Sequence, residues 1–474
     1  MMNAPKSRDV VDVRVRDYDR ANFQVKAIYD FHDPFGVSAG IDHDCCVRVR
    51  VAYNVAIALQ HADGKYFMDE VCGFSHLGKY SSHRSIGRLA ENAPHSAKMK
   101  SCSGTLETTM PLETPLLDLH RSAHAKIGEY FGTLLPSRFG DFAAEYSAAR
   151  GTVALVDTNY RAFFNFSGPD AQRYVNAVLT SNVRDLKPGL GAVGLLLTPQ
   201  GHILAEVETF GLDSGILAAS HNMVRERTFS TFDKFIIMDD VTLTDATPSL
   251  GTLDLVGPRA AALISESCGI KLGDLPELAH QEITLGSIPC RIVHRKFAGH
   301  SCATLIVASD QLSPLWRELE ARVRAQGGTI AGMEAIDSIR LECGIAWFGA
   351  DYDDKNIPHE AGLELSHISY EKGCYTGQEI VERVRSRGHA NRRLNSLQFL
   401  VANPPAAGTK LFVQGNAAVE AGYVTSAAVS PLLERPIGLG YVRREHAAIG
   451  TRLDAAGATA EVISPPLHAI TSRT

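Results

Sequence analysis

The chain has 474 residues, a formal net charge of −6, and 45% hydrophobic and 21% charged residues. This length exceeds one ordinary hydrophobic core, so two to four domains are expected, and the composition is that of a soluble globular protein. The negative net charge argues against nucleic-acid binding by the whole surface, so that any such contact must be local.

Features of cellular location are also readable in the sequence. No run of eighteen apolar residues is present, which argues against a membrane span. The first residues lack the apolar core of a signal peptide and are too acidic for a transit peptide. Nine cysteines scattered over a large chain suit a reducing compartment better than a disulfide framework. We therefore expect a cytoplasmic protein.

Residues 1–109 differ from the rest of the chain. They are rich in His, Cys, Ser and charge, with little sustained periodicity, whereas Met110 opens a segment that reads like a natural start with a helix behind it. We predict that 1–109 is an atypical, poorly ordered extension, and the sequence leaves open whether it belongs to the native protein. Five side chains could form a metal site on paper, but their spacing matches no zinc pattern: His43, Cys45, Cys46, Cys72 and His76.

The periodic region begins after Met110. Two short helices and two strands are expected first, at 127–134, 139–146, 152–157 and 161–166. Ser167 to Asp170 then reads as a helix start with Pro169 in the first turn. The following apolar residues fall on one helical face: Ala171, Tyr174, Val175, Val178 and Leu179.

Gly189 to Gly194 matches G-x-G-x-x-G but is not interpreted as a dinucleotide-binding motif. That motif requires a strand before it and a helix after it. Here a helix and a Lys-Pro loop precede it, and strand 195–198, turn 199–201 and strand 202–210 follow.

A second segment repeats the earlier arrangement. After a helix at 222–235 and a strand at 241–244, an apolar strand at 253–256 runs into Gly257-Pro258-Arg259-Ala260 and another amphipathic helix. Strand, Gly-Pro turn and helix thus occur twice. Chance is the alternative, but the shared strand and helix pattern favours a duplicated α+β unit.

Two more helices are expected at 313–327 and 331–344, and after Arg393 short apolar strands alternate with Gly and Pro. Such spacing is typical of a small antiparallel barrel or sandwich. The predicted domains are the extension 1–109, a central region 110–390 with subdomains 110–245 and 246–390, and a C-terminal β region 391–474.

The segment Lys372-Gly373-Cys374-Tyr375-Thr376-Gly377-Gln378-Glu379 carries the most specific chemistry. A thiol just before a helix N-terminus and near an ammonium has its thiolate stabilised, which makes Cys374 nucleophilic or competent to bind a metal. The alternative is a partly buried cysteine in a structural loop. Five arginines follow between Arg383 and Arg393.

This motif with its arginine-rich tail resembles the signature of folate-binding proteins that maintain iron–sulfur enzymes, sometimes called tRNA-modifying proteins. They form a branch of the superfamily of the glycine-cleavage T-protein, the aminomethyltransferase. Residues 336–344 and 358–360 are similar to the helix and loop that border the folate there, and 422–442 to its C-terminal barrel. The resemblance spans roughly residues 115–465. It implies an α+β fold of two related domains around a central folate-binding channel, plus a C-terminal antiparallel β-barrel.

The resemblance also implies site residues. Glu342 would accept two N–H groups of the pterin, and Arg383, or second Arg387, would bind the carboxylates of the folate tail. Tyr375 and Trp347 would stack on the pterin or simply pack. The alternatives are a surface Glu342 paired with a neighbouring arginine and a solvated basic helix.

One departure from the aminomethyltransferase branch concerns the strand after the Gly201 turn. That branch carries an aspartate pair there that supports methylene transfer, whereas this chain has Ala205 and Glu206. A general acid must lie within hydrogen-bond reach of its proton, so the broken pair argues against glycine cleavage.

The sequence therefore predicts a cytoplasmic, tetrahydrofolate-binding protein that supports iron–sulfur cluster assembly or repair. Cys374 would be a nucleophile or transient cluster ligand, kept ionised by Lys372, and the partners would be iron–sulfur assembly or client proteins. One alternative is a folate-dependent aminomethyltransferase or demethylase that uses Glu206. Another is a non-catalytic module that contacts tRNA or protein through Arg383–Arg393. Whether the protein is an enzyme, and whether folate is cosubstrate or structural ligand, stays open.

Overall fold

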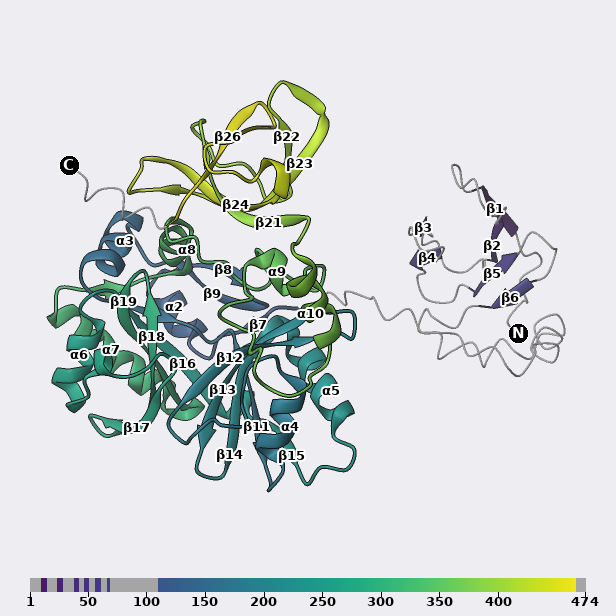
Figure 1. Ribbon diagram of the computed structural model, residues 1–474. Helices are drawn as coiled ribbons and strands as arrows, with labels where there is room; N and C mark the ends of the chain where they lie inside the picture. The colour runs from purple at the N-terminus through teal and green to yellow at the C-terminus, as the bar shows by residue number, and fades with distance from the viewer. Residues whose placement is uncertain are drawn as a thin grey trace, which may run out of the picture. The chain divides into compact units, whose positions relative to one another are not determined.

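The structure is a computed structural model that describes residues 110–465 and six short strands ahead of them. The chain divides into two compact units, Met1–Glu107 and Thr108–Thr474. The strands of the first unit are β1 (Val10–Arg14), β2 (Gln24–Ile28), β3 (Ser38–Ile41), β4 (Val47–Arg50), β5 (Ala56–Gln60) and β6 (Tyr66–Met68). They form the sheet β1-β2-β5-β6 and the pair β3-β4, drawn in purple in Figure 1. The other residues of 1–109, the metal candidates included, lie outside the described residues, so the predicted extension stays a prediction.

The second unit opens with a small sheet, β7-β9-β8. Its elements are β7 (Leu112–Glu113), α2 (Leu117–Ser122), β8 (Lys126–Tyr130) and β9 (Thr133–Arg138), followed by α3 (Phe142–Gly151). The helix predicted at 127–134 is wrong, because β8 and β9 form a hairpin. Phe131 (φ 52°) and Gly132 (φ 77°) both adopt the left-handed conformation, which makes a tight turn and stops a helix.

The first half of the duplicated region forms a five-stranded antiparallel sheet. Its elements are β11 (Arg161–Ser167), α4 (Ala171–Val178), β12 (Gly191–Leu197), β13 (Ile203–Leu212), β14 (Gly215–His221), α5 (Arg225–Phe235) and β15 (Thr242–Asp245). The strand order is β12-β13-β14-β11-β15. The predicted strands at 161–166 and 202–210 and the helix after Ser167 are confirmed, and β12 begins inside the rejected glycine motif.

The second half repeats this order. Its elements are β16 (Leu250–Val256), α6 (Ala260–Cys268), β17 (His280–Leu285), β18 (Ile288–Phe297), β19 (His300–Ala308), α7 (Leu312–Ala325) and β20 (Thr329–Ile330). The sheet order is β17-β18-β19-β16-β10-β20, with β10 (Ala154–Asp157) inserted between β16 and β20. The predicted duplication is therefore confirmed, although the hairpin β17–β18 and strand β19 were not predicted.

The Gly-Pro turn has the same cause in both halves. Gly168 and Gly257 have φ values of 106° and 116°, where a side chain would be strained. A Cβ on Gly168 would also lie 2.3 Å from the carbonyl oxygen of Asp240, and one on Gly257 2.6 Å from that of Thr152. Each glycine thus lets the chain pass close to a neighbouring backbone before its helix begins.

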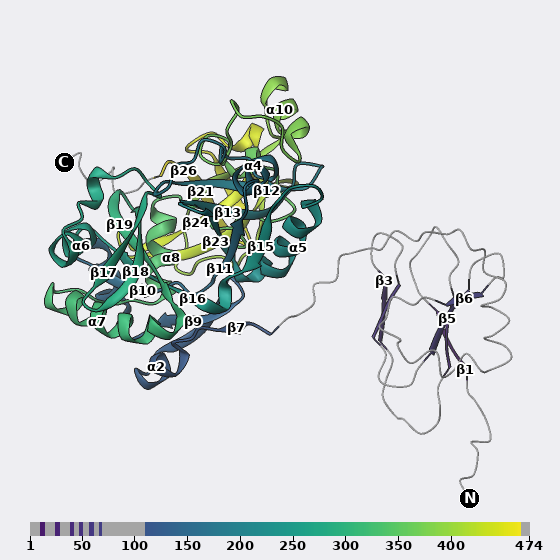
Figure 2. The same ribbon diagram turned by 90° about the horizontal axis from the view of Figure 1, so that it is seen from below.

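The two sheets pack face to face with helices outside them (Figures 1 and 2). Phe163 and Phe210 of the first sheet share a buried cluster with Val293 and Ile306 of the second. Helices α4 and α5 cover the outer face of the first sheet, and α6 and α7 that of the second. This arrangement confirms the mixed α+β class with two related domains.

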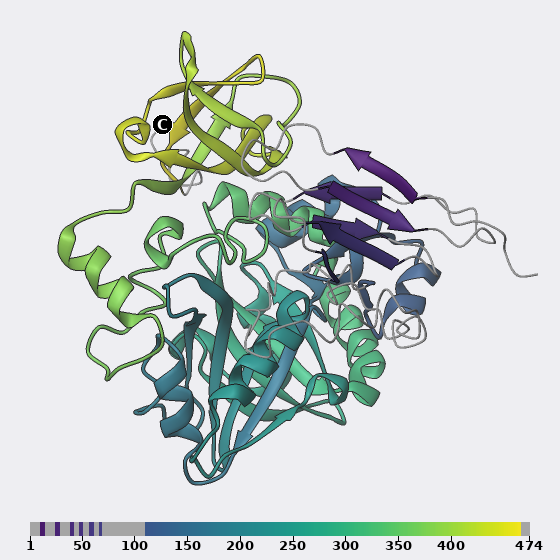
Figure 3. The ribbon, with the colours of Figure 1, turned by 90° about the vertical axis from the view of Figure 1, so that its right-hand side faces the viewer.

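The C-terminal strands close into a barrel in the order β21-β24-β23-β22-β25-β26. They are β21 (Arg392–Phe399), β22 (Lys410–Val413), β23 (Asn416–Ser430), β24 (Arg435–Arg443), β25 (Arg452–Ala455) and β26 (Ala458–Ile463). Before them come α8 (Met333–Glu342), α9 (Pro358–Ala361) and α10 (Gln378–Arg387). Leu341 of α8 packs against Ile437 and Leu439 of β24, which joins the barrel to the α+β region (Figure 3). The predicted barrel is confirmed.

Within the described residues, no helix is both long and apolar enough to span a membrane.

Candidate functional site

A central cavity of about 890 Å³ lies between the two sheets and the segment that follows α8. Strands of both halves contribute to it, as do Trp347, Phe348 and the stretch Ala361–Ser369. Clefts of this size are typical of small-molecule sites. The duplicated fold thus encloses a space to which both copies contribute side chains.

Glu206 enters this cavity from β13. Side chains alternate along a strand, so Ala205 and Val207 are buried in the core while Glu206 and Glu208 line the cavity on the opposite face. The Glu206 side chain is 22% exposed. Glu206 and Glu208 are two residues apart, a spacing that places both side chains on one face of a strand. This pattern is visible in the sequence and could have predicted both residues as part of the site.

Two neighbours hold the Glu206 carboxylate. The hydroxyl of Tyr352 donates a hydrogen bond to Oε2, and Nε2 of His367 lies 3.3 Å from the same oxygen. Burial would raise the pKa of Glu206, but the hydrogen bond and charge of His367, the charge of His221 and the Tyr352 bond outweigh it and lower the pKa to about 2. Burial raises the pKa of Tyr352, which therefore stays a donor. At neutral pH the cavity holds a carboxylate.

Four other charges of the cavity are paired with one another. Nη2 of Arg295 donates to Oε2 of Glu208 at 2.7 Å, and Arg161 lies 3.7 Å from Glu208 and 3.5 Å from Asp254. Burial opposes ionisation of Glu208, yet the two guanidinium groups keep its pKa below the usual value. Glu277 and Lys296 also line the cavity and form no ion pair among the described residues. In the same part of the chain, no arginine or lysine forms an ion pair with Glu206.

One wall of the cavity is aromatic. The ring of His221 stacks between Tyr160, at 5.5 Å and 7°, and Phe348, at 5.4 Å and 29°. Phe131 and Trp347 extend this wall, with ring centroids 5.2 Å apart. Burial lowers the pKa of His221. A planar ligand would find stacking partners here.

Four buried polar atoms of the cavity residues lack a hydrogen-bond partner within the described part of the chain. They are Nε of Arg161, Oγ of Ser181, Oδ1 of Asn182 and Nδ1 of His221. Buried polar groups in native proteins are normally satisfied, so unsatisfied ones that line a cavity indicate a polar ligand. None of these residues, nor Tyr352 or His367, was predicted, because no local sequence pattern connects them.

Glu342 lies elsewhere, at the junction of α3, α8 and the barrel. It is 0% exposed and is not among the residues that line the central cavity. It accepts bonds from the Tyr146 hydroxyl at 2.8 Å and Ser430 Oγ at 2.6 Å, and Arg150 lies 3.1 Å away. The structure therefore gives Glu342 a structural contact, and the predicted pterin contact gains no support from its position.

Cys374 is exposed in the loop before α10, three residues ahead of the N-cap Gly377. Lys372 is buried, and its three ammonium protons go to the carbonyl oxygens of Asn176, Leu179 and, at 3.0 Å, Ser181. Burial lowers the pKa of Lys372 to about 8. The Lys372 ammonium thus connects the loop to the end of α4, and all three of its N–H groups are used in these bonds. It has no N–H left to donate to the Cys374 thiol.

The remaining predicted residues are separated in the structure. Trp347 lines the central cavity, and the Arg340 guanidinium lies 4.7 Å from its ring centre. Tyr375 is buried in the core of the first half, away from the cavity lining. Arg383 is half-exposed on α10 and pairs with Glu379 at 2.6 Å. The side chain of Arg387 lies outside what the structure describes.

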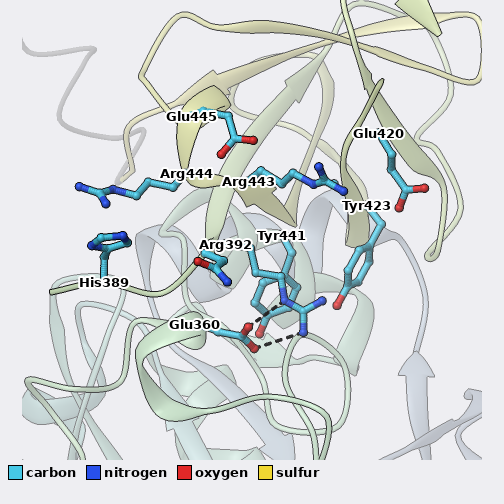
Figure 4. Close-up of a pocket in the computed structure, with 11 residues that line it drawn as sticks. Glu360, His389, Arg392, Glu420, Tyr423, Tyr441, Arg443, Arg444 and Glu445 are labelled. Atoms are coloured by element: carbon cyan, nitrogen blue, oxygen red, sulfur yellow. Dashed lines mark hydrogen bonds and ion pairs between the residues drawn. The ribbon is translucent and has the colours of Figure 1, made fainter. Parts of the chain in front are cut away.

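A second cleft, of about 930 Å³, lies between α9 and the barrel (Figure 4). Arg392 donates two hydrogen bonds to the carboxylate of Glu360, at 3.0 and 3.2 Å, and its guanidinium lies over the ring of Tyr441. Glu420 at the rim pairs with Lys410 at 2.7 Å. Arg443 and Arg444 also line this cleft, without an ion pair among the described residues. The central cavity is the better candidate site because both copies of the repeated unit contribute to it. Among the described residues, no group of three or more His, Cys, Asp or Glu is placed to hold a metal ion.

A duplicated α+β fold that encloses a polar cavity, followed by a closed barrel, defines a class of two-domain ligand-binding proteins with a C-terminal barrel. Residues 116–368, more than half of the chain, match the GCVT N-terminal domain, and 392–468 match the glycine cleavage T-protein C-terminal barrel domain. The chain therefore belongs to the glycine cleavage T-protein family. The superfamily predicted from the sequence is confirmed, whereas the iron–sulfur branch stays a prediction.

Individual relatives agree with this family. The chain is 28% identical over 332 residues to an aminomethyltransferase of Rubrobacter xylanophilus, which covers 70% of this chain and 87% of that protein. It is 24% identical over 344 residues to one from Desulforamulus reducens, covering 72% and 92%. The glycine cleavage system aminomethyltransferase T from Bartonella henselae has a TM-score of 0.67 at 22% identity, covering 75% of this chain and 98% of that one. This last similarity shows the fold alone.

Proposed function

We propose that the protein is a tetrahydrofolate-dependent one-carbon transferase that takes the carbon from an aminomethyl donor. The observation that carries the proposal is Glu206, a carboxylate held ionised in a cavity of about 890 Å³. The names of the relatives support the reaction class. This proposal adopts the aminomethyltransferase alternative ahead of the iron–sulfur function predicted first.

The lining of the cavity fits a reduced folate. The aromatic wall around His221 suits a planar ring, and the unpartnered atoms of Ser181 and Asn182 suit the polar edge of a pterin. Lys296 lines the same cavity, forms no ion pair among the described residues, and suits a carboxylate of the ligand. Tetrahydrofolate would supply the two nitrogens that receive the one-carbon unit.

Glu206 would act in two ways, by stabilising positive charge on the substrate and by accepting a proton from it. A carboxylate in a partly buried site stabilises positive charge that develops on the transferred carbon, and it can accept a proton from a substrate N–H. Tyr352 would orient Oε2 and remain protonated. The longer side chain of Glu206 would thus take over the function of an aspartate in this strand.

The test is turnover of an aminomethyl donor with tetrahydrofolate by the full-length protein. Glu206→Gln keeps the size and the hydrogen bond to Tyr352 but removes the charge, so kcat should fall roughly 10²–10⁴-fold. Tetrahydrofolate affinity, measured by calorimetry, should change little. Absence of turnover by the wild type, or turnover unchanged in Glu206→Gln, would contradict the proposal.

A second candidate is the iron–sulfur maintenance function, which the exposure of Cys374 favours. The loop that carries Cys374 is anchored by the hydrogen bonds of Lys372 and by the buried ring of Tyr375. The thiol is therefore exposed on an ordered loop. Loss of iron–sulfur enzyme activity in cells that carry Cys374→Ala but not in cells with Glu206→Gln would favour this function. The iron–sulfur partners, a tRNA contact through Arg383–Arg393 and a cytoplasmic location stay predictions.

A further inference from the structure

His367 connects the carboxylate of the cavity with the protein surface. Its Nε2 lies 3.3 Å from Oε2 of Glu206, and its Nδ1 lies 2.7 Å from Oγ of Ser366. The His367 side chain is 13% exposed, whereas Ser366 is an exposed residue. One imidazole thus touches an interior carboxylate on one side and a solvated hydroxyl on the other.

The backbone around His367 is held in place from several directions. The Thr180 hydroxyl donates to the carbonyl oxygen of His367 at 2.6 Å, and the amide of Ser369 donates to the carbonyl oxygen of Thr180 at 2.9 Å. The amide of His367 itself donates to the carbonyl oxygen of Leu363 at 3.0 Å. Because these bonds tie the segment to the end of α4, the ring is positioned before any ligand binds.

We propose that His367 is a proton relay that moves protons between Glu206 and solvent through Ser366. The inference deepens the proposed one-carbon transfer and rests on it. His367 is a positioning and relay residue, since it acts through Glu206 and need not touch the substrate.

The proposed reaction frees protons at one place and consumes them at another, and the path can carry them. Moving a carbon from an aminomethyl donor onto two nitrogens frees one proton from each nitrogen, and the two leaving groups take up these two protons. Nε2 of His367 first gives its proton to Oε2 of Glu206, which passes it to a leaving group, while Nδ1 takes a proton from Oγ of Ser366 and that oxygen takes one from water. Oε2 then accepts a proton from a substrate N–H and gives it to the freed Nε2, and Nδ1 returns its proton to Oγ of Ser366, whose own proton goes back to water. The ring is thereby restored, and no net proton is gained or lost.

The groups around Glu206 favour His367 over His221 as the relay residue. With a pKa of about 2, Glu206 does not keep a proton at neutral pH, so an accepted proton must move on. His221 also faces Glu206, but its ring lies between Tyr160 and Phe348, and its Nδ1 has no hydrogen-bond partner among the described residues. His221 therefore has no exit for a proton, whereas His367 has one. The charges of Arg161 and Glu208 also act on Glu206, and the Tyr352 hydroxyl donates to it.

The relay predicts two independent readouts for His367→Gln. The carboxyl carbon of Glu206, followed by ¹³C NMR and assigned with Glu206→Gln, should titrate at higher pH than about 2 because the hydrogen bond from the imidazole is lost. In turnover, kcat should fall roughly 10²-fold with KM nearly unchanged. Ser366→Ala should give a smaller fall, since water can replace an exposed hydroxyl.

Rescue separates a relay from a structural role. Free imidazole should restore part of the kcat of His367→Ala, with a pH dependence set by the imidazole added, and should not affect Tyr352→Phe, the control that changes the other donor to Glu206. An unchanged Glu206 titration in His367→Gln, a change in KM alone, or failure of imidazole to rescue would overturn the relay. Because the NMR titration needs no turnover, it tests the Glu206–His367 coupling even if wild-type protein fails to transfer the carbon, which would refute the proposed function instead.

Discussion

Two carboxylates, Glu206 and Glu342, have similar partners but different surroundings. Each accepts a bond from a tyrosine hydroxyl and lies near a cationic or ionisable nitrogen, from His367 in one case and Arg150 in the other. Glu342 is 0% exposed and has further donors in the barrel. Glu206 lines a cavity and, among the described residues, Oε1 accepts no bond. A carboxylate becomes available for chemistry when one oxygen is left without a protein donor.

The largest expected effect tests the structural side of this comparison. Glu342→Ala leaves Arg150 unpaired and removes the acceptor of Tyr146 and Ser430, so the free energy of unfolding should fall by about 3–5 kcal/mol. Glu206→Ala, the matched control, should cost less, because Glu206 faces a cavity and its removal leaves no buried guanidinium without a partner. Chemical denaturation followed by circular dichroism measures the free energy of unfolding of both variants. Equal decreases would contradict the structural assignment of Glu342.

A smaller expected effect is the dependence of stability on Glu206 at low pH. The pKa of Glu206 is about 2 in the folded protein against an ordinary value of 4.5, so its ionisation stabilises the fold above pH 4.5, and this contribution is lost as the pH falls toward 2. The melting temperatures of wild type and Glu206→Gln should therefore differ by a constant amount between pH 5 and 7 and converge below pH 4.5. A constant difference down to pH 3 would mean that Glu206 titrates normally.

The smallest effect concerns Cys374. The Lys372 ammonium donates to three backbone carbonyls, so Lys372→Met should change the alkylation rate of Cys374 by less than about twofold at pH 7. Mass spectrometry of the iodoacetamide adduct measures this rate, with Arg383→Gln as the control on the neighbouring helix. A tenfold slower reaction would show that the lysine does activate the thiol, as the motif suggests.

Local sequence patterns were sufficient for much of the fold. The Gly-Pro turns at Gly168 and Gly257 marked both copies of the repeat, because only a residue without a side chain fits that backbone. The apolar helical face of α4 followed from its spacing. The hairpin of β8 and β9 was missed because apolar residues three to four apart fit a helix as well as two short strands.

The sequence by itself indicated the duplicated unit, the barrel and the superfamily, and it named Glu206, one of several acids that line the cavity. Those features depend on turns, periodicity and motifs that lie close together in the chain. Only the tertiary structure decided which carboxylate faces the cavity, since Glu342 meets Arg150 across nearly two hundred residues. It also decided that Lys372 binds α4 and that His367 reaches Glu206, because contacts between distant segments depend on how the two sheets and the loop after α8 pack.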